Sequence, residues 1–272
     1  KGILEFLLTS HPLDCPVCDK GGECPLQNLT MKFGPTDSRF LLDEKHHGEK
    51  RFSLGELILL DRERCILCGR CVRFQDQIAD DPVLAFDLRG RDAEIITNST
   101  PGFDSIFSGN TTDICPVGAL TTSDFRFGAR PWEMEASASI CNQCPVGCNI
   151  MYNIRREARK DGKVVIKRVL PRQNEEVNEI WMCDKGRFTY QYYESPERLT
   201  SPLIRRGGEL VKTSWEEAIE FAAQQVRAAA TNLAVLASGR LSNEDLFTLK
   251  KFADTINGKA ILHTTISGGD RV

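Results

Sequence analysis

The segment Cys65-Ile66-Leu67-Cys68-Gly69-Arg70-Cys71 places three cysteines at every third position of the chain. A fourth cysteine, Cys115, lies farther along and is followed directly by Pro116. A Cys-x2-Cys-x2-Cys trio completed by a later Cys-Pro pair is the ligand arrangement of bacterial ferredoxins. We therefore expect a ferredoxin-like module with one [4Fe-4S] cluster, held by Cys65, Cys68, Cys71 and Cys115.

Two more groups repeat the scheme of a close trio and one outlying residue. The first consists of His11, Cys15, Cys18 and Cys24, and the third of Cys141, Cys144, Cys148 and Cys183. The chain has 11 cysteines, which with His11 make twelve candidate ligands, or three sets of four with none left over. Three [4Fe-4S] clusters are therefore predicted.

Disulfides and zinc are the other uses of such cysteines. An odd number of cysteines at Cys-x-x-Cys spacing, with no secretory signal in the sequence, argues against a disulfide scaffold. Structural zinc sites usually take their ligands as two separated pairs, whereas each set here is a trio with one outlier. Iron–sulfur clusters are favoured, and a structural zinc-binding interaction protein stays the alternative without redox chemistry.

The ferredoxin template also predicts which ligand positions of a second cluster are replaced in this chain. A two-cluster ferredoxin would carry a second set of cysteines where this chain has Gln75, Ser105, Ser108 and Thr111. The module is thus interpreted as a two-cluster ferredoxin that keeps one cluster. If the intervening residues are instead only a loop that delivers Cys115, the predicted ligands are the same.

Charge near the sets bears on their reduction potentials. A neutral imidazole at His11, in place of a thiolate, makes the first cluster less negative by about one charge and should raise its potential. Four arginines lie near the second set in the sequence: Arg62, Arg64, Arg70 and Arg73. They either offset the negative charge of its cluster or form a solvated surface.

The composition of the 272 residues limits the possible functions. Hydrophobic residues make up 41% and charged residues 27%, values of an ordinary globular protein. A net charge of −3 gives no overall basic field for nucleic acid. No run reaches the roughly 18 apolar residues of a membrane span, so direct membrane insertion is not expected. We find no catalytic triad, no paired carboxylates and no activated nucleophile, which favours electron transfer over bond-making chemistry.

The pattern of the remaining chain predicts four domains. Residues 1–45 should be a loop-rich wrap with short helices, 46–130 the ferredoxin-like module, and 131–195 a small β-rich cluster domain with a hairpin turn at Asp161-Gly162. Residues 196–272 alternate strand and helix patterns, with a capping box at Ser214–Glu217, and indicate the start of an α/β domain. The predicted fold class is therefore α+β iron–sulfur modules followed by a β-α-β unit.

These motifs resemble those of the large iron–sulfur subunit of bacterial respiratory complex I, the NADH-quinone oxidoreductases. The resemblance covers nearly the whole chain and lies in Gly21-Gly22-Glu23-Cys24-Pro25-Leu26-Gln27, in Arg62 to Arg73, in Phe107 to Leu120, and in Ser139 to Phe188. The third site and the segment from Leu199 onward also resemble molybdopterin oxidoreductases.

The resemblance implies an electron path. Electrons would pass from NADH through FMN on a neighbouring subunit, along the clusters, toward quinone, while the whole complex translocates protons. It implies the flavin/NADH-binding subunit and other peripheral-arm subunits as partners, at the cytoplasmic side of the bacterial inner membrane. The family also carries an amino-terminal [2Fe-2S] domain and a longer molybdopterin-type domain without its cofactor. We expect this chain to be a fragment that lacks the first and most of the second.

The rival family is the catalytic subunit of NAD-linked formate dehydrogenases. It shares the histidine-bearing motif and the third cluster, but its members typically keep two complete ferredoxin runs. The four replaced positions therefore argue for the complex I family.

Overall fold

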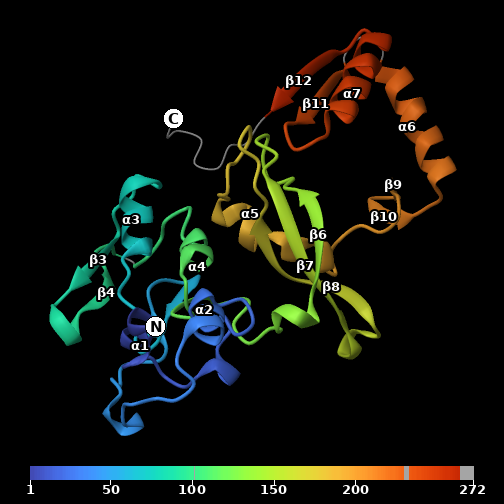
Figure 1. Ribbon diagram of the computed structural model, residues 1–272. Coiled ribbons are helices and arrows are strands. Elements are labelled where there is room, and N and C mark those ends of the chain that lie inside the picture. Colours follow the sequence, from blue (N-terminus) through green and yellow to red (C-terminus); the bar gives the residue numbers. More distant parts are fainter. Residues whose placement is uncertain (101, 230–232, 264–272) are drawn as a thin grey trace. The chain divides into compact units, whose positions relative to one another are not determined.

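The computed structural model describes residues 1–100, 102–229 and 233–263 (Figure 1). The chain divides into two compact units. The first comprises Lys1–Ile140 and Cys148–Tyr190, and the second Cys141–Gly147 and Gln191–Val272.

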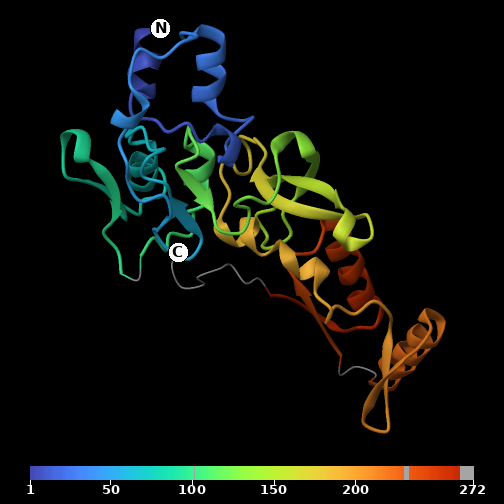
Figure 2. The same ribbon diagram turned by 90° about the horizontal axis from the view of Figure 1, so that it is seen from below.

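The first unit begins with the expected loop-rich wrap. Its elements are the helices α1 (Gly2–Leu8) and α2 (Pro25–Phe33) and the 3-10 turns η1 (Cys15–Val17) and η2 (Leu42–Glu44). Helix α2 starts where Cys24 Sγ accepts a hydrogen bond from the Gln27 amide, and Pro25 at the first position needs no such partner. The two helices lie side by side (Figure 2). The residues between them are free to wrap a site.

The ferredoxin-like part follows, with short strands and two short helices. Its elements are β1 (Phe52–Ser53), β2 (Ile58–Leu60), α3 (Arg70–Gln77), β3 (Leu84–Asp87), η3 (Gly90–Asp92), β4 (Glu94–Thr97), α4 (Asn110–Ile114) and β5 (Leu120–Thr122). Strands β1, β2 and β5 form one antiparallel sheet, and β3 pairs with β4 in a hairpin. Helix α3 packs against both β3 and α4. This brings the chain around Cys71 next to the chain around Cys115.

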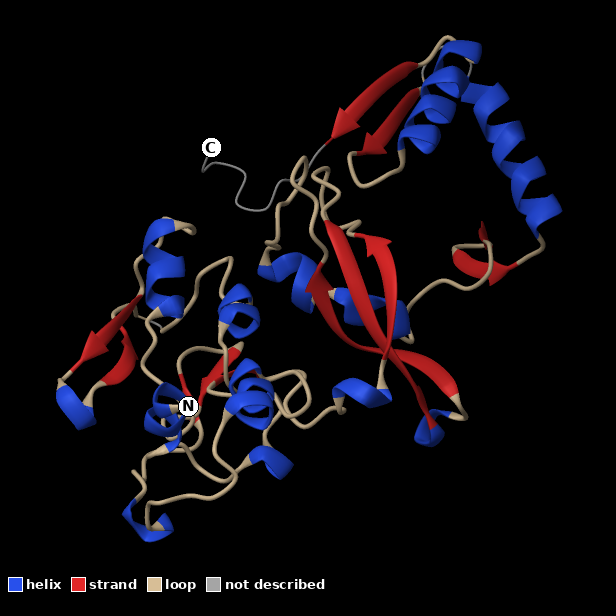
Figure 3. Cartoon of the chain, in the orientation of Figure 1, coloured by secondary structure: helices blue, strands red, loops and turns tan. Residues whose placement is uncertain are grey.

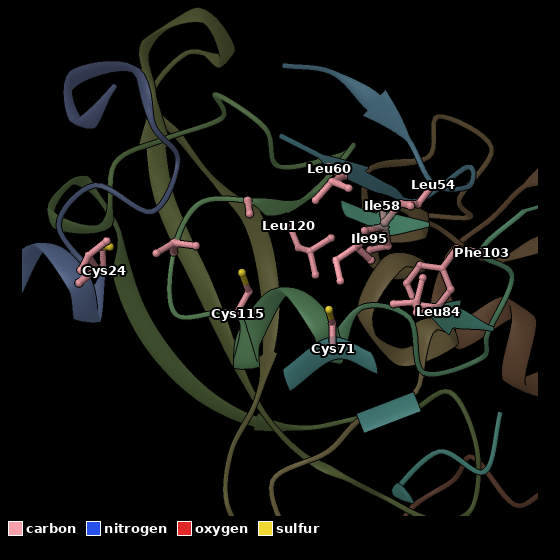
Figure 4. Close-up of a cluster of buried hydrophobic side chains, with 13 residues drawn as sticks. Cys24, Leu54, Ile58, Leu60, Cys71, Leu84, Ile95, Phe103, Cys115 and Leu120 are labelled. Atoms are coloured by element: carbon pink, nitrogen blue, oxygen red, sulfur yellow. The ribbon is translucent and has the colours of Figure 1, made fainter. Parts of the chain in front are cut away.

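The main hydrophobic core surrounds two cysteines of the second set. Cys71 and Cys115 lie among fully buried aliphatic side chains, including Leu60, Ile95 and Leu120 (Figure 4). Burial of each large aliphatic side chain contributes roughly 1.5–3 kcal/mol. The same apolar side chains therefore stabilise the module and shield these thiols from water.

A three-stranded antiparallel sheet completes the first unit. It consists of β6 (Glu135–Ile140), β7 (Asn149–Glu157) and β8 (Lys163–Pro171), preceded by η4 (Pro131–Glu133) and followed by helix α5 (Asp184–Phe188). After η5 (Ala158–Lys160), the chain reverses at Asp161-Gly162, where φ is 55° and 72°. Both residues are left-handed, as a tight hairpin turn requires, and the predicted turn is confirmed.

The second unit contains the predicted β-α-β unit (Figure 3). After η6 (Tyr190–Glu194), its elements are β9 (Leu203–Arg206), β10 (Glu209–Lys212), α6 (Trp215–Ala229), β11 (Ala234–Ser238), α7 (Asn243–Thr255) and β12 (Lys259–His263). Strands β11 and β12 run parallel, and α7 packs on both. The Ser214 cap is confirmed, because Ser214 Oγ accepts a hydrogen bond from the Glu217 amide. The Glu217 carboxylate does not complete a capping box but accepts hydrogen bonds from Thr213 and Arg206. The expected fold class, α+β modules followed by an α/β start, is therefore correct.

Candidate metal centres

One small cavity collects the whole second set. Cys65, Cys68, Cys71 and Cys115 all line it. Left-handed backbone at Leu67 and Gly69, with φ of 53° and 69°, turns the chain between the three close cysteines. Apart from Arg70 and Gly69, the other lining residues are aliphatic: Leu60, Ile66, Ile95, Val117, Ala119 and Leu120. The four cysteines of the set therefore line one cavity whose remaining walls are mostly aliphatic.

Two thiols of this cavity are buried, and their charged form is unfavourable unless a cation is bound. Burial, with added repulsion from the neighbouring cysteines, raises the pKa of Cys65 to about 11 and that of Cys71 to about 12. A bare thiolate is therefore unfavourable there, whereas thiolates bound to iron are stabilised by its charge. Backbone amides already donate to the sulfurs, for example those of Leu67 to Cys65 and Val72 to Cys71. Hydrogen bonds of this kind stabilise the charged sulfurs of a cluster.

A second cavity collects the whole first set. His11, Cys15, Cys18 and Cys24 line it together with Asp14, Gly21, Gln27, Arg64 and Gly118. His11 Nδ1 is buried and has no hydrogen-bond partner among the residues that the structure describes. Burial, with added repulsion from Lys45 and Arg64, lowers the pKa of His11 to about 4. The imidazole is therefore neutral at physiological pH, which is the form that binds metal.

The segment Cys115–Gly118 joins the two cavities. Cys115 lines the second cavity, and the carbonyl oxygen of the next residue, Pro116, lies 3.5 Å from Cys24 Sγ of the first set. Gly118 lines the first cavity so closely that an added Cβ would lie 2.1 Å from Cys18 Sγ. The segment that begins with Cys115 of the second set therefore lies directly against Cys18 and Cys24 of the first.

The described side chains of the two sets are not gathered as the ligands of a single metal ion would be. A zinc ion draws its thiolates to within about 2.3 Å of one point, whereas a cubane holds its ligands apart by its own width. Throughout the described part of the chain, no three His, Cys, Asp or Glu side chains come together closely enough for a single metal ion. Each of these two sets instead surrounds a cavity.

The third set is divided between the two compact units. Cys141 and Cys144 belong to the second unit, and Cys148 and Cys183 to the first. Cys141 directly follows β6 and Cys148 directly precedes β7, so the loop between these paired strands carries the trio. In the second unit, Arg240 donates hydrogen bonds to Asn142 O and Gln143 Oε1 and so fixes this loop. Ligation of a cluster by this set stays a prediction.

The sequence analysis did not predict the hydrogen bonds of the Asp184 carboxylate, which lies directly after Cys183. The Asp184 carboxylate, at the start of α5, accepts hydrogen bonds from the amide and hydroxyl of Ser108 and from the Gly109 amide at 2.6–3.0 Å. Arg187, almost fully buried, pairs with Asp113. Nothing local in the sequence predicts this contact across more than 70 positions. It fastens the residue after Cys183 to the ferredoxin-like part.

The positions that the template marks as lost ligands all lie inside the protein. Gln75 and Thr111 are fully buried, and Ser105 and Ser108 nearly so. Ser108 bonds Asp184, and the Thr111 hydroxyl donates to Ser108 O. Polar side chains thus occupy the places where a second cluster would have its ligands.

The four arginines do not form one group around the second set. Arg70 lines the second cavity, but Arg64 is buried and its side chain lines the first. Arg62 stacks on Phe52 and pairs with Glu94, and Arg73 is exposed. The structure therefore places the Arg64 side chain in the lining of the first cavity and not of the second.

Four families of iron–sulfur and molybdopterin proteins match successive parts of the chain. They are the NADH-ubiquinone oxidoreductase-G iron-sulfur binding region (residues 1–39), the ferredoxin-like domain of NADH-quinone oxidoreductase subunit 3 (55–121), the NDSU1/NuoG-like 4Fe-4S domain (138–191) and molybdopterin oxidoreductase (198–269). The NADH-quinone oxidoreductase G subunit of Streptomyces coelicolor is 48% identical over 93% of the chain. The chain belongs to the G-subunit family of NADH-quinone oxidoreductases. The resemblance noted from the motifs is thereby confirmed.

The match covers only part of the relatives of this family. NADH-quinone oxidoreductase subunit 3 of Thermus thermophilus is 45% identical to the chain over 80% of the chain. The chain spans 29% of the Streptomyces relative and 28% of the Thermus relative. A solved NAD+-reducing [NiFe]-hydrogenase shares 32% identity over 47% of this chain and 55% of that chain, with a TM-score of 0.40. Within the described ranges, no helix combines the length and apolarity that a membrane crossing needs.

Proposed function

We propose that this chain is the electron-relay part of its NADH-quinone oxidoreductase and that it carries electrons through [4Fe-4S] clusters. The observation that supports this most directly is the pair of adjoining cavities. Each is lined by a complete set of four ligands, and the Cys115–Gly118 segment belongs to both. A relay needs closely spaced redox centres, and the two predicted ligand sets lie next to each other.

A bound cubane would supply the ability to take up and release one electron, and the chain supplies everything else. The first cluster would be held by His11, Cys15, Cys18 and Cys24, the second by Cys65, Cys68, Cys71 and Cys115, and the third by Cys141, Cys144, Cys148 and Cys183. In the second cavity, Leu60, Ile95 and Leu120 exclude water, and backbone amides donate to the thiolates. In the first, the neutral imidazole of His11 lowers the negative charge of the ligand set.

In the whole protein, the relay would run from NADH and FMN on a partner subunit toward quinone. The complete enzyme would couple that flow to proton translocation in the peripheral arm of a membrane complex, at the cytoplasmic side of the bacterial inner membrane. The longer protein would add a [2Fe-2S] cluster, and no molybdopterin is expected. These statements rest on the family and on the length that its members have beyond this chain.

The proposal is tested by removing one ligand from the assembled, anaerobically purified complex. Cys115→Ala should cost about four irons and one cubane signal in electron paramagnetic resonance, and NADH:quinone activity should fall with them. Ile114→Val changes the adjacent residue without touching a ligand atom, and should leave the iron content and the spectrum unchanged.

Two outcomes would overturn this function. Zinc in place of iron, with a silent spectrum after reduction, would indicate a structural zinc protein. Iron with formate-dependent reduction of NAD, and no quinone reduction, would favour the formate dehydrogenase alternative.

A further inference from the structure

Arg64 connects the two sets in an unexpected way. Its backbone precedes Cys65 of the second set, but its side chain lies in the wall of the first cavity and is only 5% exposed. There its Nε and Nη2 donate to one carboxylate oxygen of Asp14, at 3.0 and 2.9 Å. Asp14 lines the same cavity and directly precedes Cys15. An ion pair is therefore built into the wall of the first site.

This ion pair is held in place from both sides. The Arg64 amide donates to Asp61 Oδ1 at 3.1 Å, Arg64 Nε lies 3.2 Å from Asp61 Oδ2, and the Asp61 amide donates to Ala119 O. Asp14 also pairs with Lys50 at 2.8 Å. Each charge of the pair therefore has a further partner that holds it in place, Asp61 for Arg64 and Lys50 for Asp14.

Other charged groups surround the pair. Lys50 forms ion pairs with both Asp14 and Glu63, and Lys45 Nζ donates to carbonyl oxygens at the end of α1. Lys50, Glu63 and Lys45 do not line the first cavity. Among the described residues that line this cavity, Arg64 and Asp14 are the charged ones, and Asp61 and Lys50 lie behind them as their further partners.

Fixed charges next to a redox centre change its reduction potential in a known direction. Reduction adds negative charge, so a nearby cation favours the reduced state and a nearby anion opposes it. The effect is stronger in a buried cavity, where water screens little. Neither Arg64 nor Asp14 lines the second cavity, which has Arg70 instead. Their influence should therefore be largest on the first cluster.

We propose that Arg64 and Asp14 act as an opposed pair that sets the reduction potential of the first cluster. Arg64 raises the potential and Asp14 lowers it. This inference rests on the proposed function, because it takes the His11 set as the ligands of a cluster.

The test measures both cluster potentials in the assembled complex by redox titration followed by electron paramagnetic resonance. Arg64→Gln should lower the potential of the first cluster, and Asp14→Asn should raise it. The second cluster should keep its potential in both variants. Arg70→Gln is the matched control, because it should lower the potential of the second cluster and leave that of the first unchanged.

The opposite signs separate tuning from a structural role. If the ion pair served only to hold the fold, both substitutions would disturb the site alike. Shifts of the first potential in the same direction, no shift, or equal shifts at the second cluster would overturn the inference. If Arg64→Gln prevents assembly of the cluster, two other variants still test the inference. Arg64→Lys keeps the positive charge and should largely keep the potential of the first cluster, and Asp14→Asn should raise it. A wild-type complex with no cubane at the first site would instead refute the proposed function.

Discussion

Gly118→Ala tests whether the two cavities depend on one another. The added Cβ would lie 2.1 Å from Cys18 Sγ and 3.3 Å from Lys20 Cβ, whereas atoms in favourable contact are about 3.5–4.0 Å apart. Cys18 or the backbone must therefore move by more than about 1 Å. Gly118 has no positive φ, so alanine suits its backbone and only the clash is tested. Overpacking of this kind lowers the free energy of unfolding by roughly 1–3 kcal/mol.

The displaced residue is a ligand, so the expected loss is specific. The variant complex should contain about four irons fewer and lack the signal of the first cluster, while the second cluster remains. Gly2→Ala is the control, because an added Cβ there meets nothing within 4 Å and should not alter the iron content. Full iron content and an unchanged first-cluster signal in Gly118→Ala would refute the placement of Cys18 against this segment.

Three further changes have defined outcomes. His11→Cys should keep a cluster but lower its potential in a redox titration, because a thiolate adds about one negative charge; an unchanged potential would remove His11 from the ligands. Asp184→Ala should lower the free energy of unfolding in urea by about 1.5–3 kcal/mol, since it leaves buried donors unpaired, whereas Lys250→Ala on the surface of α7 should change it little. The folded His11 has a pKa near 4 instead of 6.5, so the unfolded chain takes up the proton first as the pH falls. The stability that the neutral imidazole contributes is full above pH 6.5 and is lost as the pH falls toward 4, and cluster-free wild-type protein should therefore lose more stability over that range than cluster-free His11→Gln does.

Features encoded by neighbouring residues could be predicted from the sequence. The Asp161-Gly162 turn, the Ser214 cap and the β-α-β unit each depend on residues close together in the chain, and all are present. The same holds for the close groups of the first and second predicted ligand sets, because short turns suffice to bring the members of each around one cavity. The outlying Cys115 could be assigned because a Cys-Pro pair is part of a known arrangement.

Other features depend on residues that are distant in sequence. Strand β6, Glu135–Ile140, has no clear strand pattern because small and polar residues dominate it, and its pairing with β7 determines its conformation. Sequence position alone assigns Arg64 to the cysteines beside it, but neighbouring residues can point their side chains in opposite directions. The hydrogen bond from Ser108 to Asp184 could not be predicted from the sequence. The ferredoxin template shows that Ser108 stands where a cysteine ligand would be, but not which residue Ser108 contacts instead.

The shared segment Cys115–Gly118 has a consequence for the order in which the chain can form its two sites. Cys115 would bind the second cluster, while Pro116 and Gly118 lie against Cys24 and Cys18 of the first. The walls of both sites therefore include backbone from the same four residues. The first site cannot take its final shape before this segment, which lies more than 90 positions farther along the chain, has reached Cys24.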